Sequence, residues 1–175
     1  MTQQLSHRVL ACSLISVCLA SGCDQQQRQS DQTVERPGQP PVADVEDDDP
    51  QMLAAIGKAR ETVDTFVAAL QNPQPSQSSF SVKMPITDGP NTEHMWILPV
   101  RLENDQFVGQ LNNEPDALQG KKLGDTVRVA KDKISDWMFT ENRRLVGGYT
   151  LRVLRSNMSA AERAEFDKTV DFAVD

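Results

Sequence analysis

The polar side chains that could carry chemistry gather in two short blocks, each ending in a tryptophan. One block is residues 93–96 (EHMW) and the other is residues 134–137 (ISDW). A histidine, two carboxylates and two large aromatic rings suit either general acid–base catalysis or a ligand-binding wall. We expect the two blocks to come together in the folded domain and to form its functional surface. The candidate binding residues are Glu93, His94, Trp96, Asp136 and Trp137.

Catalysis is the less favoured interpretation of these residues. His94 is the only histidine after residue 22, which excludes a two-histidine metal site in the mature chain. Glu93 and His94 are neighbours on an expected strand, and successive strand side chains point to opposite faces. A triad of a serine, His94 and Asp136 or Asp88 is arithmetically possible, but no nucleophile-elbow motif is present. The sequence therefore favours a non-catalytic binding or interaction module. An envelope hydrolase that uses His94 with Glu93 or Asp136 is the alternative.

A purely structural interpretation of the same residues also stays open. Trp96 and Trp137 are the only tryptophans, and both are large enough to serve as core residues. Asp136 could cap a turn or accept a hydrogen bond from a backbone N–H. Gly147-Gly148 does not make a phosphate loop, because no GxxxxGK[ST] motif occurs in the chain. We therefore expect no cofactor and no metal.

Cys23 is the cysteine that we expect to be modified, by attachment of a lipid. A short basic start at residues 7–8 precedes a largely apolar run at residues 9–20. This run is shorter than the roughly 20 residues that span a bilayer, and it is typical of a signal-peptide core. Residues 19–23 (LASGC) resemble the lipobox of bacterial lipoproteins, in which the cysteine thiol takes a diacylglycerol, although Ala20 stands where leucine is favoured. An ordinary cleaved signal and an uncleaved membrane helix are the alternatives.

Lipidation at Cys23 would place the protein on the exported side of a membrane. Asp24 directly after the cysteine favours the inner membrane, because it resembles a retention signal of enteric bacteria. Cys12 and Cys18 would be lost with the signal peptide, so the mature chain would have no disulfide and no cysteine metal site. The expected partners are the membrane, through the lipid on Cys23, and an unknown envelope protein or small ligand.

The charge of the chain is concentrated in a segment of low hydrophobicity. Residues 24–50 carry eight acidic and two basic side chains, whereas residues 51–175 carry 17 acidic and 15 basic ones. The nearly balanced second part has no basic footprint for nucleic acid. We expect a signal peptide at residues 1–22, a lipidated cysteine and disordered acidic tether at residues 23–50, and a single monomeric domain at residues 51–175.

A helix is expected to open the domain. Asp49 can cap it, and Pro50 suits the first helical position, where no N–H is needed. Apolar residues from Met52 to Leu70 recur at spacings of three and four, which predicts one apolar stripe. Asn72-Pro73 ends the helix. We expect the stripe to pack on the sheet that follows.

Alternation of apolar and polar residues then predicts antiparallel strands. The expected strands are residues 79–84, 93–102, 106–111, 126–130 and 134–139, the last of these being the final strand. Turns are expected at residues 87–91 and 103–105.

The C-terminal part is expected to be helical. Residues 150–155 fit a strand or a helix, and the helical face is the better match. A capping box at residues 159–162 starts a last helix, lined by Phe166, Val170 and Ala173. The fold class is therefore α+β: an N-terminal amphipathic helix, a curled antiparallel sheet of four or five strands, and a C-terminal helical segment.

Several blocks of this domain resemble one bacterial family, the one catalogued as domain of unknown function 2314, or YegJ-like proteins. The matching blocks are residues 88–89 (DG), 93–96 (EHMW), 122–125 (KLGD), 134–138 (ISDWM) and 147–152 (GGYTLR). The resemblance covers nearly all of residues 51–171. It implies the domain boundary near residue 50 and implies no activity.

Overall fold

A computed structural model describes residues 33–34, 42–43, 49–116 and 118–175. Two short strands, β1 (Thr33–Val34) and β2 (Val42–Ala43), pair in antiparallel fashion within the segment whose composition predicts an irregular tether. The expected signal peptide, Cys23 and most of the expected tether lie outside the described residues. Their expected roles therefore stay predictions.

The N-terminal helix forms where the sequence predicts it, but it is interrupted once. Helix α1 (Pro50–Glu61) begins at Asp49, whose Oδ1 accepts hydrogen bonds from the backbone N–H groups of Gln51 (2.7 Å) and Met52 (2.9 Å). Helix α2 (Val63–Gln71) follows after Thr62. The expectation of one continuous helix is therefore wrong at Thr62. The Thr62 hydroxyl donates to the carbonyl of Lys58 (2.8 Å), a backbone contact that bends helices.

The apolar stripe of α1 and α2 packs on the sheet, as expected. Ala59, Val63 and Phe66 are buried. The Phe66 ring contacts three further aromatic rings, with centroid distances of 5.9 Å to Phe80, 5.6 Å to Phe107 and 5.5 Å to Trp137. These four rings join the helices to strands that are far apart in the sequence.

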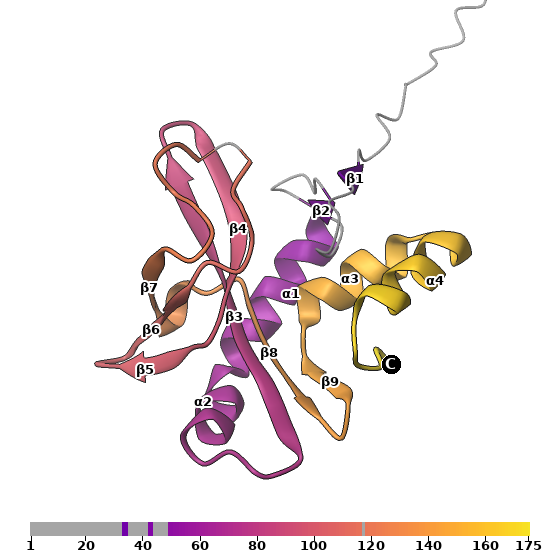
Figure 1. Ribbon diagram of the computed structural model, residues 1–175, viewed down its shortest axis with the longest axis horizontal. Coiled ribbons are helices and arrows are strands. Elements are labelled where there is room, and N and C mark those ends of the chain that lie inside the picture. Colours follow the sequence, from indigo (N-terminus) through magenta and orange to yellow (C-terminus); the bar gives the residue numbers. More distant parts are fainter. Residues whose placement is uncertain (1–32, 35–41, 44–48, 117) are drawn as a thin grey trace, which may run out of the picture. The chain divides into compact units, whose positions relative to one another are not determined.

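The strands form two antiparallel sheets in place of the single sheet expected (Figure 1). The larger sheet has the order β4-β3-β8-β9 and the smaller has the order β5-β6-β7. The larger sheet comprises β3 (Gln77–Asp88), β4 (Asn91–Ile97), β8 (Asp136–Glu141) and β9 (Arg144–Gly147). The smaller comprises β5 (Arg101–Glu103), β6 (Gln106–Gln110) and β7 (Thr126–Ala130), with the 3-10 turn η1 (Lys131–Lys133) after it.

Two of the expected strand assignments are wrong. The strand expected at residues 93–102 is divided between the two sheets, and it breaks at Pro99, which has no N–H to donate to a neighbouring strand. The strand expected to be the last one is followed by β9, which pairs with β8 through a tight turn at Asn142 and Arg143, both with positive φ. The α+β class itself is confirmed.

The C-terminal part is helical, as the sequence predicts. Helix α3 (Tyr149–Asn157) starts directly after Gly148. Helix α4 (Ala160–Thr169) begins with the expected capping box and buries Phe166. Val170 and Ala173 lie beyond the end of α4, so their expected place on this helix is wrong. Ala173 instead bonds to the β8–β9 hairpin, donating to the carbonyl of Arg143 (2.8 Å). Among the described residues, no helix has the length and apolar character needed to cross a bilayer.

Candidate functional site

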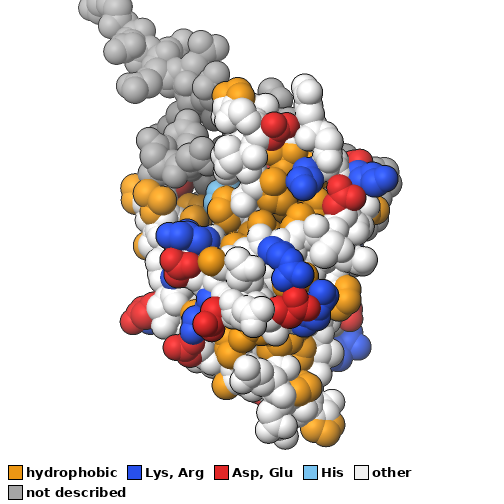
Figure 2. All heavy atoms as spheres, turned by 90° about the vertical axis from the view of Figure 1, so that its left-hand side faces the viewer, with side chains coloured by type: hydrophobic (Ala, Val, Ile, Leu, Met, Phe, Trp, Pro, Cys, Tyr) orange, Lys and Arg blue, Asp and Glu red, His pale blue; other side chains and the backbone are white. Residues whose placement is uncertain are grey.

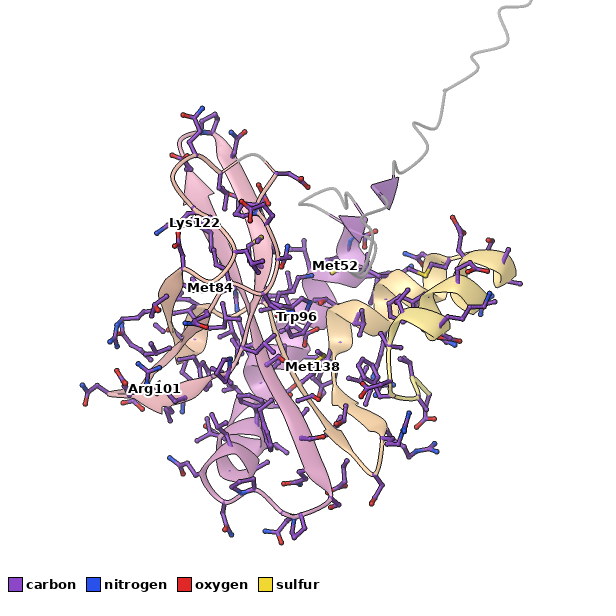
Figure 3. All side chains as sticks on the ribbon, viewed as in Figure 1. Met52, Met84, Trp96, Arg101, Lys122 and Met138 are labelled. Carbon is purple, nitrogen blue, oxygen red and sulfur yellow. The ribbon has the colours of Figure 1, made fainter. Side chains whose placement is uncertain are left out.

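The register of the larger sheet separates a core face from a polar face. On the central strand β3, Lys83 pairs with Trp96 of β4 on one side and with Asp136 of β8 on the other. Paired residues share a face, so these three side chains lie side by side across three strands. Val82, the neighbour of Lys83, pairs with Ile97 and Trp137 on the core face. Figure 3 shows Trp96 near the middle of this sheet.

Asp136 is a buried cap for helix α3 and is not a surface residue. Its side chain is fully shielded, at 0% exposure. Its oxygens accept four hydrogen bonds, from the N–H groups of Trp137 (2.8 Å), Tyr149 (3.1 Å) and Thr150 (2.7 Å) and from the Thr150 hydroxyl (2.7 Å). The first helical N–H groups thereby find an acceptor that Gly148, at the N-cap position, cannot supply. Burial raises the pKa of the Asp136 carboxyl, while the hydrogen bonds from Thr150 and Trp137 act in the opposite direction.

Trp137 is also buried, and it belongs to the core. Its indole Nε1 donates to the carbonyl of Ala59 in α1 (2.9 Å), and its ring stacks in the aromatic cluster at 1% exposure. The sequence predicts Asp136 and Trp137 on a binding surface, and their burial contradicts that prediction. The two residues lie on opposite faces of β8, and both are buried because α1 packs against Trp137 and the start of α3 covers Asp136.

Glu93 and His94 point to opposite faces, as alternation on a strand predicts. Glu93 pairs with the core-facing residue Ile86, and its carboxylate accepts from the backbone N–H groups of Asp116 (3.0 Å) and Leu118 (3.1 Å). It therefore fastens the loop before β7 and does not join His94 on the polar face.

His94 joins the two sequence blocks, which confirms that they come together. Its Nδ1 and the hydroxyl of Ser135 share a hydrogen bond of 2.6 Å. Ser135 has 0% exposure, and its backbone N–H donates to the carbonyl of Lys83 (2.8 Å). Because the hydroxyl is buried, the pair orients the His94 ring and does not present a nucleophile to solvent.

Lys83 is the site residue that sequence reasoning missed. Its Nζ lies 5.9 Å from the centroid of the Trp96 ring, a cation–π distance. Within the described part of the chain, this ammonium makes no hydrogen bond and no ion pair. Burial lowers the pKa of Lys83, and the attraction of Asp136 offsets part of this effect. Alternation along β3 predicts that Lys83 and Val82 point to opposite faces. That Lys83 lies between Trp96 and Asp136 follows only from the pairing of β3 with β4 and β8.

Several side chains of the polar face keep some exposure, Thr87, Thr92 and Met138 among them, and three others form a short row. His94 is exposed, and Trp96 and Lys83 are half-buried. We call this row the Lys83 face. It combines an aromatic wall, a hydrogen-bonding ring and a cation, which together can hold a flat ligand carrying a polar group. Over residues 49–116 and 118–175, no group of three or more His, Cys, Asp or Glu side chains is placed to hold a metal ion.

A separate shallow depression of about 470 Å³ lies between β3 and β7. It is lined by Met84, Pro85, Ile86, Thr87, Lys121, Thr126, Val127 and Arg128. None of the five residues singled out from the sequence lines it. Figure 2 looks onto the side that carries β5–β7, where apolar side chains lie among scattered charges of both signs. Arg128 is engaged by Glu103 (2.8 Å), which weakens the case for this depression as a charged site.

The sequence of this domain places it in a family of bacterial proteins. Residues 49–173 match the family described as "Uncharacterized protein conserved in bacteria (DUF2314)". This chain belongs to that family. The match starts at residue 49, which is also the N-cap of α1.

Two relatives are similar to this chain over part of their length. An uncharacterized protein, YegJ, of Escherichia coli K12 is 36% identical over 100 residues, which are 57% of this chain and 64% of the relative. A putative ankyrin repeat protein of Neisseria meningitidis serogroup B is 41% identical over 87 residues, which are 49% of this chain and 34% of the relative. The matches thus span less than two thirds of each relative. No solved structure matches the chain.

Proposed function

We propose that this protein is a lipid-anchored envelope protein whose domain is a non-catalytic binding module. Its ligand surface is the Lys83 face, formed by Lys83, His94 and Trp96. The lipid on Cys23 holds the module to the membrane, with the inner membrane favoured by Asp24. The ligand is an envelope protein segment or a small molecule that offers a planar group and a polar group.

One observation carries the binding proposal: Lys83 holds a half-buried ammonium that the described residues do not pair. Burying a charge without a hydrogen-bonded partner is unfavourable, and the lowered pKa of Lys83 reports that penalty. An apolar side chain of similar length would fit the same place with less cost. A residue that lowers stability in an otherwise well-packed sheet is a candidate for function, because functional sites often contain residues that are unfavourable for folding stability.

The burial of the neighbouring groups supports binding over turnover. Catalysis needs a nucleophile or a base that reaches the substrate. Ser135 is shielded, and Asp136 is engaged by four donors. The exposed or half-buried groups of this face include the Trp96 ring, the His94 imidazole, the Lys83 side chain and the hydroxyls of Thr87 and Thr92. Such a set suits recognition of a ligand.

The anchor is tested by metabolic labelling with a palmitate analogue. Wild-type protein should incorporate the label and fractionate with membranes, and Cys23→Ser should do neither. Cys18→Ser is the matched control, because Cys18 would leave with the signal peptide. Equal labelling of the wild type and Cys23→Ser would refute lipidation at Cys23.

The binding surface is tested by crosslinking the full-length protein in intact envelopes. Variants Lys83→Met and His94→Ala are compared with Lys121→Met, which removes an exposed lysine that lines the depression between β3 and β7. We expect specific crosslinked species to disappear in the first two variants and to persist in the third. A crosslinking pattern that all three variants share with the wild type would remove this face as the binding surface.

A further inference from the structure

We propose that Lys83 binds its ligand covalently, as an imine with the carbonyl carbon of an aldehyde. The inference rests on the Lys83 face proposed above and adds a chemical step to it. The ligand class is a small aldehyde with a flat body that lies against Trp96.

The position of Lys83 on the central strand supplies the geometry. Its amine lies over the Trp96 ring at 5.9 Å from the centroid, and β4 and β8 flank it on both sides. The central strand fixes the position of the Lys83 backbone, and the side chain that extends from it is half-buried. The ring offers the stacking surface that would bring a planar carbonyl compound to the amine. The ammonium is not committed to any acceptor within the described residues, so no ion pair must be broken before it reacts.

The chemical step needs the neutral amine. Its lone pair attacks the carbonyl carbon, a C–N bond forms, and the nitrogen proton passes to the oxygen. Loss of water then gives the imine, and addition of water reverses the reaction without any oxidant or reductant. Burial lowers the pKa of Lys83, which enlarges the neutral fraction near neutral pH.

Two other ionisable groups face this amine. Asp136, on β8, favours the charged form of Lys83, and its attraction is the smaller of the two effects on the pKa. His94, on β4, lies two residues from Trp96 on the same face and is held by Ser135. Nothing in this arrangement requires His94 to be a nucleophile.

The test is reductive trapping on the full-length, detergent-solubilised protein. The probe is 4-carboxybenzaldehyde with cyanoborohydride, and peptide mass spectrometry gives the modified fraction at each lysine. The exposed Lys121 is the internal control. We expect modification at Lys83 to be several-fold faster than at Lys121 near pH 7. The excess should shrink as the pH approaches 10.5, the usual pKa of a lysine. Equal rates at the two lysines, or slower modification at Lys83, would overturn the proposal.

A matched variant and a matched probe separate this proposal from the binding proposal. Lys83→Arg keeps the charge over Trp96 but should lose the trapped adduct. The alcohol 4-(hydroxymethyl)benzoate has the same ring and no carbonyl carbon to attack. If the alcohol slows crosslinking at the Lys83 face and no adduct forms with the aldehyde, the binding surface stands and the imine is refuted. If an adduct forms while crosslinking is unaffected in Lys83→Met, the amine is reactive and the binding proposal fails.

Discussion

The two tryptophans offer a direct test of which part of this site is core. Trp137→Phe keeps an aromatic ring but removes the indole N–H that donates to the carbonyl of Ala59 (2.9 Å). Ala59 has 0% exposure, so its carbonyl would lose a buried donor. Leaving a buried acceptor without its partner costs about 1–3 kcal/mol. The smaller ring adds a void costing roughly 1 kcal/mol, so the expected loss is about 2–4 kcal/mol.

Trp96→Phe is the matched control for this prediction. It makes the same chemical change at a half-buried ring on the Lys83 face. The ring keeps a face for the Lys83 ammonium, and surface changes of this kind stay within about 0.5 kcal/mol. Urea unfolding followed by far-ultraviolet circular dichroism avoids using the removed fluorophore, and an unchanged m-value would show that the midpoints report stability. Equal midpoints for Trp137→Phe and the wild type, or a larger loss for Trp96→Phe, would refute the assignment of core and surface.

Four further changes test other parts of the structure by the same unfolding assay. Gly147→Ala should cost about 2–4 kcal/mol, because a Cβ there would meet the Trp137 ring at 2.5 Å and the residue has a φ of +73°; a neutral result would contradict this packing. Asp136→Ala should cost roughly 3–5 kcal/mol by leaving the α3 N–H groups without their acceptor, and a change below about 1 kcal/mol would show that the cap is dispensable. Lys83→Met should stabilise the protein at neutral pH: the pKa of Lys83 is lowered by folding, so the penalty on its charged form is absent above pH 10.5 and appears as the pH falls. A gain that does not depend on pH would count against this cause. Deleting residues 24–47 should leave the unfolding midpoint of the domain unchanged, and a clear drop would mean that this segment contributes to its stability.

Local signals in the sequence were enough to place most of the regular elements. Asp49 and Pro50 mark the start of α1, and the capping box at Ser159 marks the start of α4, because each depends on groups within one helical turn. The turn at Asn104 and Asp105 is likewise short-range, and both residues adopt the positive φ that such turns require. The family membership also follows from the sequence, through blocks that persist from residue 88 to residue 152.

The strand boundaries were less well predicted because periodicity gives no information about pairing partners. Residues 93–102 alternate as one strand would, yet the chain leaves the larger sheet after Ile97 and enters the smaller one at Arg101. β9 has four residues, too few for a pattern to stand out. β9 forms because its backbone pairs with the edge of β8, and that edge is present only in the assembled sheet.

By itself, the sequence determined the α+β class, the meeting of two polar blocks and the opposite directions of Glu93 and His94. Only the tertiary structure decided which of those polar residues face solvent. Asp136 and Trp137 are buried because α1 and α3 cover β8, and Lys83 enters the site because the register places it between Trp96 and Asp136. Alternation along a strand determines which residues share its face. Which face is covered, and what lies across the next strand, depend on contacts between residues far apart in the chain.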